Sequence, residues 1–171
     1  MIYAVTGLRS GTSMMMNALI AGGMNAKYSP KDIDRLWVGD YHPNKNGFFE
    51  LSREDVESDD FPSQFDGYLI KIPIRKLGSL SATKGMKIVY MYRDVETVEQ
   101  SFDKLGEING GFSRRKRPSV YFDRLPFIFA NLINRDDIMG FDVLDYNRIL
   151  NNPLRWFNYL KKHGWPIDPQ K

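Results

Sequence analysis

Hydrophobic and polar positions divide the chain into runs with strand periodicity and runs with helix periodicity. Apolar, β-branched and aromatic residues form strand-like runs at residues 1–7, 68–72, 87–92 and 141–144. Apolar residues recur at helical spacing at residues 12–22, 95–105, 121–133 and 153–164. Strands that alternate with helices predict an α/β fold, in which a mostly parallel sheet lies between two layers of helices in a three-layer α/β/α arrangement.

Turn and capping residues set the expected ends of these helices. Asp94 is a good N-cap for the helix that follows it, and Gly106 is expected to end that helix. Pro126 predicts a kink within the run 121–133, because proline removes a backbone donor inside a helix. The stretch 28–62 is rich in Pro, Gly, Asp and Asn, which predicts loops and short helices that shape a substrate pocket.

Length and composition narrow the classes of protein. A chain of 171 residues fits one domain, residues 1–171, that buries its own core. The absence of cysteine excludes disulfides, thiolate metal sites and cysteine nucleophiles. A net charge of +3 is too small to indicate nucleic acid as a partner, but it suits a ligand with several negative charges. No signal peptide or integral membrane segment is evident, so a cytoplasmic location is expected.

A loop rich in glycine and hydroxyl residues follows the first predicted strand. It reads Gly7-Leu8-Arg9-Ser10-Gly11-Thr12-Ser13 and leads into the first predicted helix. Glycines let backbone N–H groups converge on one point, and the helix N-terminus adds free donors. The arginine fork and three hydroxyls complete a predicted cradle for an oxyanion. A Walker A loop would be one residue longer and would carry a lysine before its Ser or Thr, so this loop departs from that pattern.

A second predicted anion site follows the strand 87–92. Arg93 stands where this strand ends, on the edge at which parallel sheets bind ligands. Ser101 lies eight positions later, beside the apolar stripe of the next helix, so its hydroxyl is expected to face the sheet. A guanidinium and a hydroxyl held in this way can bind a phosphate monoester.

Together these segments resemble the sulfotransferase family, whose donor is 3′-phosphoadenosine 5′-phosphosulfate (PAPS). The loop resembles the Gly-x-Arg-Ser-Gly-Thr-Ser form of many bacterial members, and Tyr92-Arg93-Asp94 with Ser101 resembles the family's second motif. Residues 143–153 resemble its late strand and the helix after it.

The resemblance implies a P-loop NTPase-like sulfotransferase fold. It also implies that the protein binds PAPS without a metal. It also implies that Arg93 and Ser101 bind the 3′-phosphate. The residues implied to bind the 5′-phosphosulfate are Arg9, Ser10, Gly11, Thr12 and Ser13.

Three residues are the candidates for catalysis. Arg9 is placed to stabilise negative charge on the 5′ side, and Lys71 ends a predicted strand at a point where the family often has a lysine near the sulfuryl group. Glu50 is the candidate general base, because Asn46-Gly47-Phe48-Phe49-Glu50 resembles a stretch of bacterial sulfotransferases and its aromatic neighbours can partly bury it. His42 is the alternative base.

The sequence leaves two other functions open. One is a non-catalytic module that binds 3′-phosphoadenosine nucleotides, since the histidine base of one branch of the family is absent. The other is a P-loop nucleotide kinase, which would bind ATP with magnesium. For a sulfotransferase, the expected partner is a small-molecule, lipid or carbohydrate acceptor that carries a hydroxyl or an amine.

Overall fold

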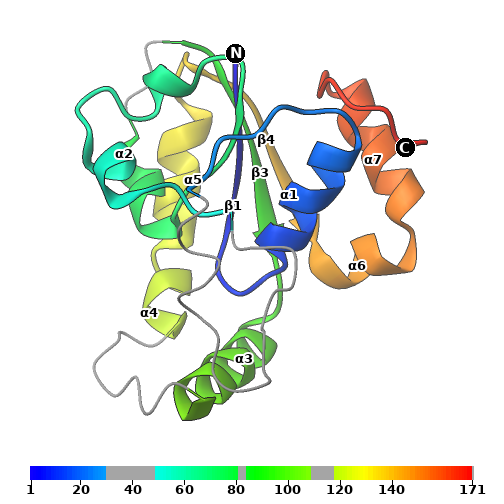
Figure 1. Ribbon diagram of the computed structural model, residues 1–171. Helices are drawn as coiled ribbons and strands as arrows, with labels where there is room; N and C mark the ends of the chain where they lie inside the picture. The colour runs from blue at the N-terminus through cyan, green and yellow to red at the C-terminus, as the bar shows by residue number, and fades with distance from the viewer. Residues whose placement is uncertain (30–48, 81–83, 109–117, 171) are drawn as a thin grey trace.

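The computed structural model describes residues 1–29, 49–80, 84–108 and 118–170. These residues form an α/β fold around one parallel sheet (Figure 1). The order of the four strands across the sheet is β2-β1-β3-β4. The strands are β1 (Ile2–Gly7), β2 (Leu69–Lys71), β3 (Met86–Tyr92) and β4 (Ile138–Asp145). The four predicted strands are therefore confirmed, although β2 is shorter and β4 longer than the hydrophobic runs indicate.

Helices lie on both sides of the sheet, with α1 and α7 on one side and α2 and α5 on the other (Figure 1). The described chain is thus compatible with the predicted three layers. The α-helices are α1 (Thr12–Ala21), α2 (Arg53–Glu57), α3 (Val95–Ile108), α4 (Pro118–Phe122), α5 (Leu125–Ile133), α6 (Tyr146–Asn151) and α7 (Pro153–Lys162). Two 3₁₀ helices are η3 (Ser63–Phe65) and η4 (Ile74–Ser79). No helix within the described ranges has both the length and the apolar character to cross a membrane.

The core has a separate cluster on each face of the sheet, because successive side chains of a strand point to opposite faces. On β1, Val5 packs with the cluster under α1 and α7, whereas Ala4 packs with the cluster on the other face. On β3, Val89 and Ile88 divide in the same way. The middle residues of both strands are buried on both faces, which explains why their sequences are largely continuous apolar runs.

Capping residues act largely as expected, with two corrections. Asp94 accepts a hydrogen bond from the backbone N–H of Thr97 at 2.8 Å, which confirms it as a helix cap. The expected end at Gly106 is wrong, because α3 continues to Ile108; an interior glycine costs a helix only about 0.5–1 kcal/mol. The expected kink at Pro126 is also wrong. Proline stands in the first turn of α5, where no backbone donor is lost, and a turn separates α5 from α4.

The strand order places the ends of β1 and β3 at a topological switch point. From β1 the chain crosses to β2 on one side and then returns to β3 on the other side of β1. Connections that leave in opposite directions open a crevice at the carboxyl edge of a parallel sheet. The loop after β1 and the residues that follow β3 meet at this crevice, so the fold brings the two predicted anion sites together.

Candidate anion-binding site

The loop between β1 and α1 has a backbone that few residues other than glycine adopt. Gly11 has φ 83°, and Arg9 has φ 50°, which places a non-glycine residue in the left-handed region. Such a conformation costs about 1–2 kcal/mol, and it persists where the surroundings fix it. A Cβ atom on Gly7 would overlap Ser10 Oγ and the backbone oxygen of Met91. The loop is therefore held tightly against the end of β3.

Arg9 reaches from this loop to helix α3. Its Nε donates a hydrogen bond to Ser101 Oγ at 3.2 Å, across 92 positions of sequence. Ser101 is partly buried, and its hydroxyl faces the loop after β1. The contact joins one residue from each of the two predicted anion sites, so the two sites are adjacent and form one candidate site.

Arg93 follows directly after β3 and is held by an aromatic ring. Its guanidinium lies 4.7 Å from the centre of the Tyr146 ring, in a cation–π contact. Arg93 Nε and Ser10 Oγ are both buried, and neither has a hydrogen-bond partner among the described residues. Buried polar atoms are nearly always paired, so two orphaned donors at one crevice indicate the place of a polar ligand.

Lys71 brings a second cation to the loop from the end of β2. Its Nζ lies 3.3 Å from Ser13 Oγ and 2.6 Å from Glu50 Oε1. The Lys71 side chain is 11% exposed and that of Glu50 is 40% exposed. The lysine is thus a buried, paired group and not a chain that extends into solvent. This contact joins the candidate base, the candidate cation and the loop.

The remaining candidates lie at or outside this cluster. Thr12 is buried at the first residue of α1. His42, the alternative base, lies outside the described residues. The second histidine, His163, lies away from the site, where its Nδ1 is 2.9 Å from the buried carboxylate of Asp142.

Tyr146 is a site residue that sequence reasoning missed. It follows β4 directly, and a Cβ on Gly11 would overlap its ring, so the ring lies between the loop and Arg93. Asp145 fixes this position, because its side chain caps α6 by accepting from the Arg148 N–H at 2.9 Å. The sequence did contain one indication that Tyr146 belongs to the site: it follows a predicted parallel strand, as Arg93 does.

The ends of all four strands therefore contribute to one site at the carboxyl edge of the sheet. Arg9, Lys71, Arg93 and Tyr146 follow or end β1, β2, β3 and β4 respectively. Comparisons with protein-family models, with curated proteins and with solved structures find no match for this chain.

Proposed function

We propose that the chain is a sulfotransferase that moves a sulfuryl group from PAPS to an acceptor hydroxyl, on a P-loop NTPase-like sulfotransferase fold. The observation that carries the proposal is the hydrogen bond between Arg9 and Ser101. In the family that the sequence resembles, the first residue belongs to the 5′-phosphosulfate loop and the second to the 3′-phosphate site. A donor with both groups on one nucleoside needs those two elements at one crevice.

The residues present fit such a donor. Arg93 Nε and Ser10 Oγ are buried donors without a described partner, and phosphate and sulfate oxygens are acceptors of the matching kind. The left-handed residues Arg9 and Gly11 give the loop the turns that aim backbone N–H groups at one point. Arg93 and Ser101 would bind the 3′-phosphate, and the loop from Arg9 to Ser13 would bind the 5′-phosphosulfate.

The proposed reaction is a single in-line displacement at sulfur. A bond forms between the acceptor oxygen and sulfur, while the bond from sulfur to the bridging oxygen of the 5′-phosphate breaks. Glu50 takes the proton of the acceptor hydroxyl, and 3′-phosphoadenosine 5′-phosphate (PAP) leaves with the bonding electrons. Arg9 and Lys71 stabilise the negative charge that grows on the bridging oxygen. The ion pair between Lys71 and Glu50 supports these two roles, because it brings the proposed cation and the proposed base into contact.

Ligand binding tests the proposal first. PAP should raise the melting temperature of the protein without magnesium, since the site consists of protein donors alone. Stabilisation by ATP that requires magnesium would instead favour a nucleotide kinase and would contradict the proposal. Turnover is the second measurement: labelled PAPS and a panel of hydroxyl acceptors should give labelled product. PAP binding without any turnover would instead indicate that the protein is a non-catalytic module that binds 3′-phosphoadenosine nucleotides.

A further inference from the structure

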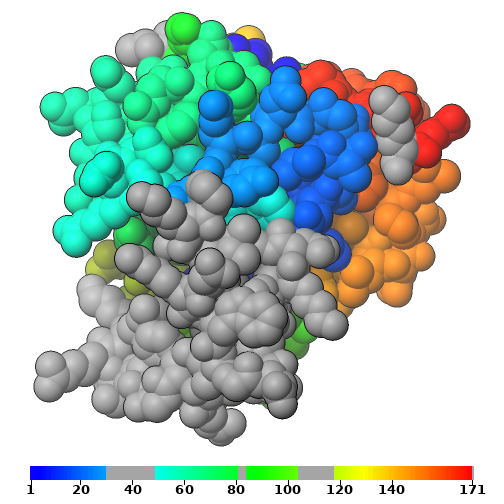
Figure 2. All heavy atoms as spheres, in the orientation of Figure 1, coloured from blue at the N-terminus to red at the C-terminus, as the bar shows by residue number. Residues whose placement is uncertain are grey.

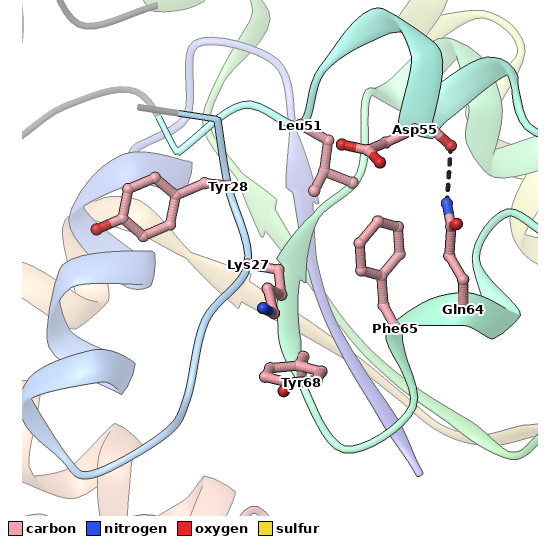
Figure 3. A pocket seen from close by; sticks show the side chains of 7 residues that line it. All are labelled: Lys27, Tyr28, Leu51, Asp55, Gln64, Phe65 and Tyr68. Atoms are coloured by element: carbon pink, nitrogen blue, oxygen red, sulfur yellow. Dashed lines mark hydrogen bonds between the residues drawn. The ribbon is translucent and has the colours of Figure 1, made fainter. Parts of the chain in front are cut away.

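A hollow of about 280 Å³ opens beside β2, outside the anion-binding site (Figure 3). Three of its lining residues are aromatic, three are polar or charged, and one is aliphatic. The lining residues are Lys27, Tyr28, Leu51, Asp55, Gln64, Phe65 and Tyr68. Liquid water occupies about 30 Å³ per molecule, so the hollow has room for a ligand the size of one sugar ring.

The walls of this hollow combine flat apolar surfaces with fixed polar groups. The Lys27 ammonium lies 4.8 Å from the centre of the Tyr68 ring, which holds both side chains in the wall. Gln64 Nε2 donates to the backbone oxygen of Asp55 at 3.2 Å, as the dashed line in Figure 3 marks. A sugar presents an apolar ring face and a rim of hydroxyls, which match aromatic rings and polar side chains respectively.

The charged residues in the lining of the hollow indicate whether its ligand is neutral or ionic. The lining holds one cation, Lys27, and one anion, Asp55. An anionic ligand would be attracted by the lysine and repelled by the aspartate, and a cationic ligand the reverse, so the lining has no net attraction for either charge. Hydroxyl groups can donate to the carboxylate and accept from the ammonium, so a neutral polyhydroxy ring satisfies both.

The segments that form the hollow also position the candidate reaction residues. The backbone N–H of Lys27 donates to the oxygen of Leu69 on β2, the strand that ends in Lys71. The backbone N–H of Ser29 donates to the backbone oxygen of Glu50 at 2.8 Å, and Leu51, which lines the hollow, follows Glu50 in the chain. On the surface, residues 24–29 (light blue) lie beside residues 49–65 (cyan), as Figure 2 shows. The segments that line the hollow are therefore hydrogen-bonded to, or continuous with, the segments that carry Lys71 and Glu50.

We infer that this hollow binds a sugar ring of the acceptor, so that the substrate class is carbohydrate. The inference rests on the proposed sulfotransferase function. A non-reacting ring bound by segments that are hydrogen-bonded to those of Lys71 and Glu50 would orient the acceptor and supply binding energy remote from the bond that forms.

The test is saturation-transfer NMR on the full chain with a set of methyl glycosides at millimolar concentration. Phenol and a straight-chain alcohol serve as acceptors of the other classes. Ring protons of at least one glycoside should receive saturation from the wild-type protein. Gln64→Ala and Lys27→Ala should each weaken that binding about fivefold to tenfold, as expected for loss of a hydrogen bond. Arg53→Ala is the control, because this residue lies on α2 beside the hollow, is 86% exposed and lines no part of it.

Each outcome separates this inference from the proposed function. Failure of every glycoside to bind, or binding that is unchanged in both pocket variants, overturns the sugar site. Preferential binding of phenol or of the alcohol overturns it as well. PAP binding is measured on the same variants by thermal shift, and it should be unchanged. If glycosides bind in the hollow while PAP does not bind to any variant, the sugar site stands as a carbohydrate-binding site and the sulfotransferase function fails.

Discussion

Arg9 Nε lies 3.2 Å from Ser101 Oγ, so that the loop after β1 and the helix after β3 share one hydrogen bond at the carboxyl edge of the sheet. The contact connects residues that the proposed function assigns to opposite ends of one nucleotide. It can hold the Arg9 fork in place before the donor binds, which lowers the ordering cost of binding.

Ser101→Ala should weaken PAP binding roughly tenfold. The substitution removes a hydroxyl proposed to bind the 3′-phosphate and also removes the hydrogen bond from Arg9 to α3. The expected loss is that of a hydrogen bond to a charged group. Titration calorimetry measures the affinity. Ser79→Ala is the control, because its hydroxyl donates to the Lys76 backbone oxygen at an exposed position of η4. Wild-type affinity in Ser101→Ala would remove the residue from the donor site.

Arg93→Ala should discriminate between two donors. We expect PAP binding to weaken by about 1.5–3 kcal/mol, the range for hydrogen bonds to charged groups. Adenosine 5′-phosphosulfate lacks the 3′-phosphate, so its binding should change little. Arg155→Ala is a matched control, since its guanidinium lies 5.7 Å from the centre of the Trp156 ring on α7, away from the loop. Equal losses for both nucleotides would contradict the assignment of Arg93 to the 3′-phosphate.

Glu50→Gln should lower turnover about 10²–10⁴-fold, the usual contribution of a general base, while PAP affinity stays near that of the wild type. The amide keeps the size of the side chain and loses the basic oxygen that lies 2.6 Å from Lys71 Nζ. Single-turnover rates with labelled PAPS measure the effect. Glu57→Gln is the control, because that carboxylate also forms an ion pair, with Arg53, on an exposed helix face. Retained turnover in Glu50→Gln, with loss in His42→Ala, would transfer the role of base to His42.

Alkaline pH should destabilise the fold through Tyr90. Burial raises the pKa of this phenol above its ordinary value of about 10, with a further contribution from Tyr92, because the charged form is disfavoured in the core. The stabilisation is complete below about pH 10 and is lost as the pH rises toward the pKa in the folded state. Urea unfolding of Tyr90→Phe should therefore show a shallower alkaline decline than the wild type. Tyr28→Phe changes a residue that is 41% exposed and should keep the wild-type slope.

The sequence predicted the strands, the first residues of α1, α3 and α7, and the meeting of the two anion motifs. Those features depend on local pattern and on strand direction. A continuous β-branched and aromatic run made 87–92 recognisable as a central strand, and the rule that ligands bind at carboxyl ends placed Arg93. The kink at Pro126 failed, since a proline at the first turn of a helix and one at a kink have similar sequence surroundings.

Features that depend on tertiary contacts could not be predicted from the sequence. Nothing local indicates that the Tyr146 ring lies against Gly11, because the two residues are brought together only when β4 takes its place beside β3. The hollow beside β2 likewise joins residues 27–28 to residues 51–68 through backbone pairing that no motif marks. The ion pair of Lys71 with Glu50 was not expected either, although both residues were named as candidates.

The contact between Gly11 and Tyr146 gives the last prediction, which concerns the shape of the loop. Gly11→Ala should destabilise the protein and weaken PAP binding for two reasons. A side chain at φ 83° costs about 1–2 kcal/mol, and the new Cβ would overlap the Tyr146 ring. Gly78→Ala is the control, because a Cβ there meets Ile128 Cγ1 at an ordinary distance of 3.5 Å and no positive φ is involved.

A double-mutant cycle separates those two costs. In the Tyr146→Ala background the ring is gone, so Gly11→Ala should retain only the backbone cost. The free energies of unfolding should then be non-additive by about 0.5–3 kcal/mol, the range for residues in contact. Strict additivity would show that the ring does not press on the loop in solution. The conservative Tyr146→Phe keeps the ring and should leave the effect of Gly11→Ala as it is in the wild type.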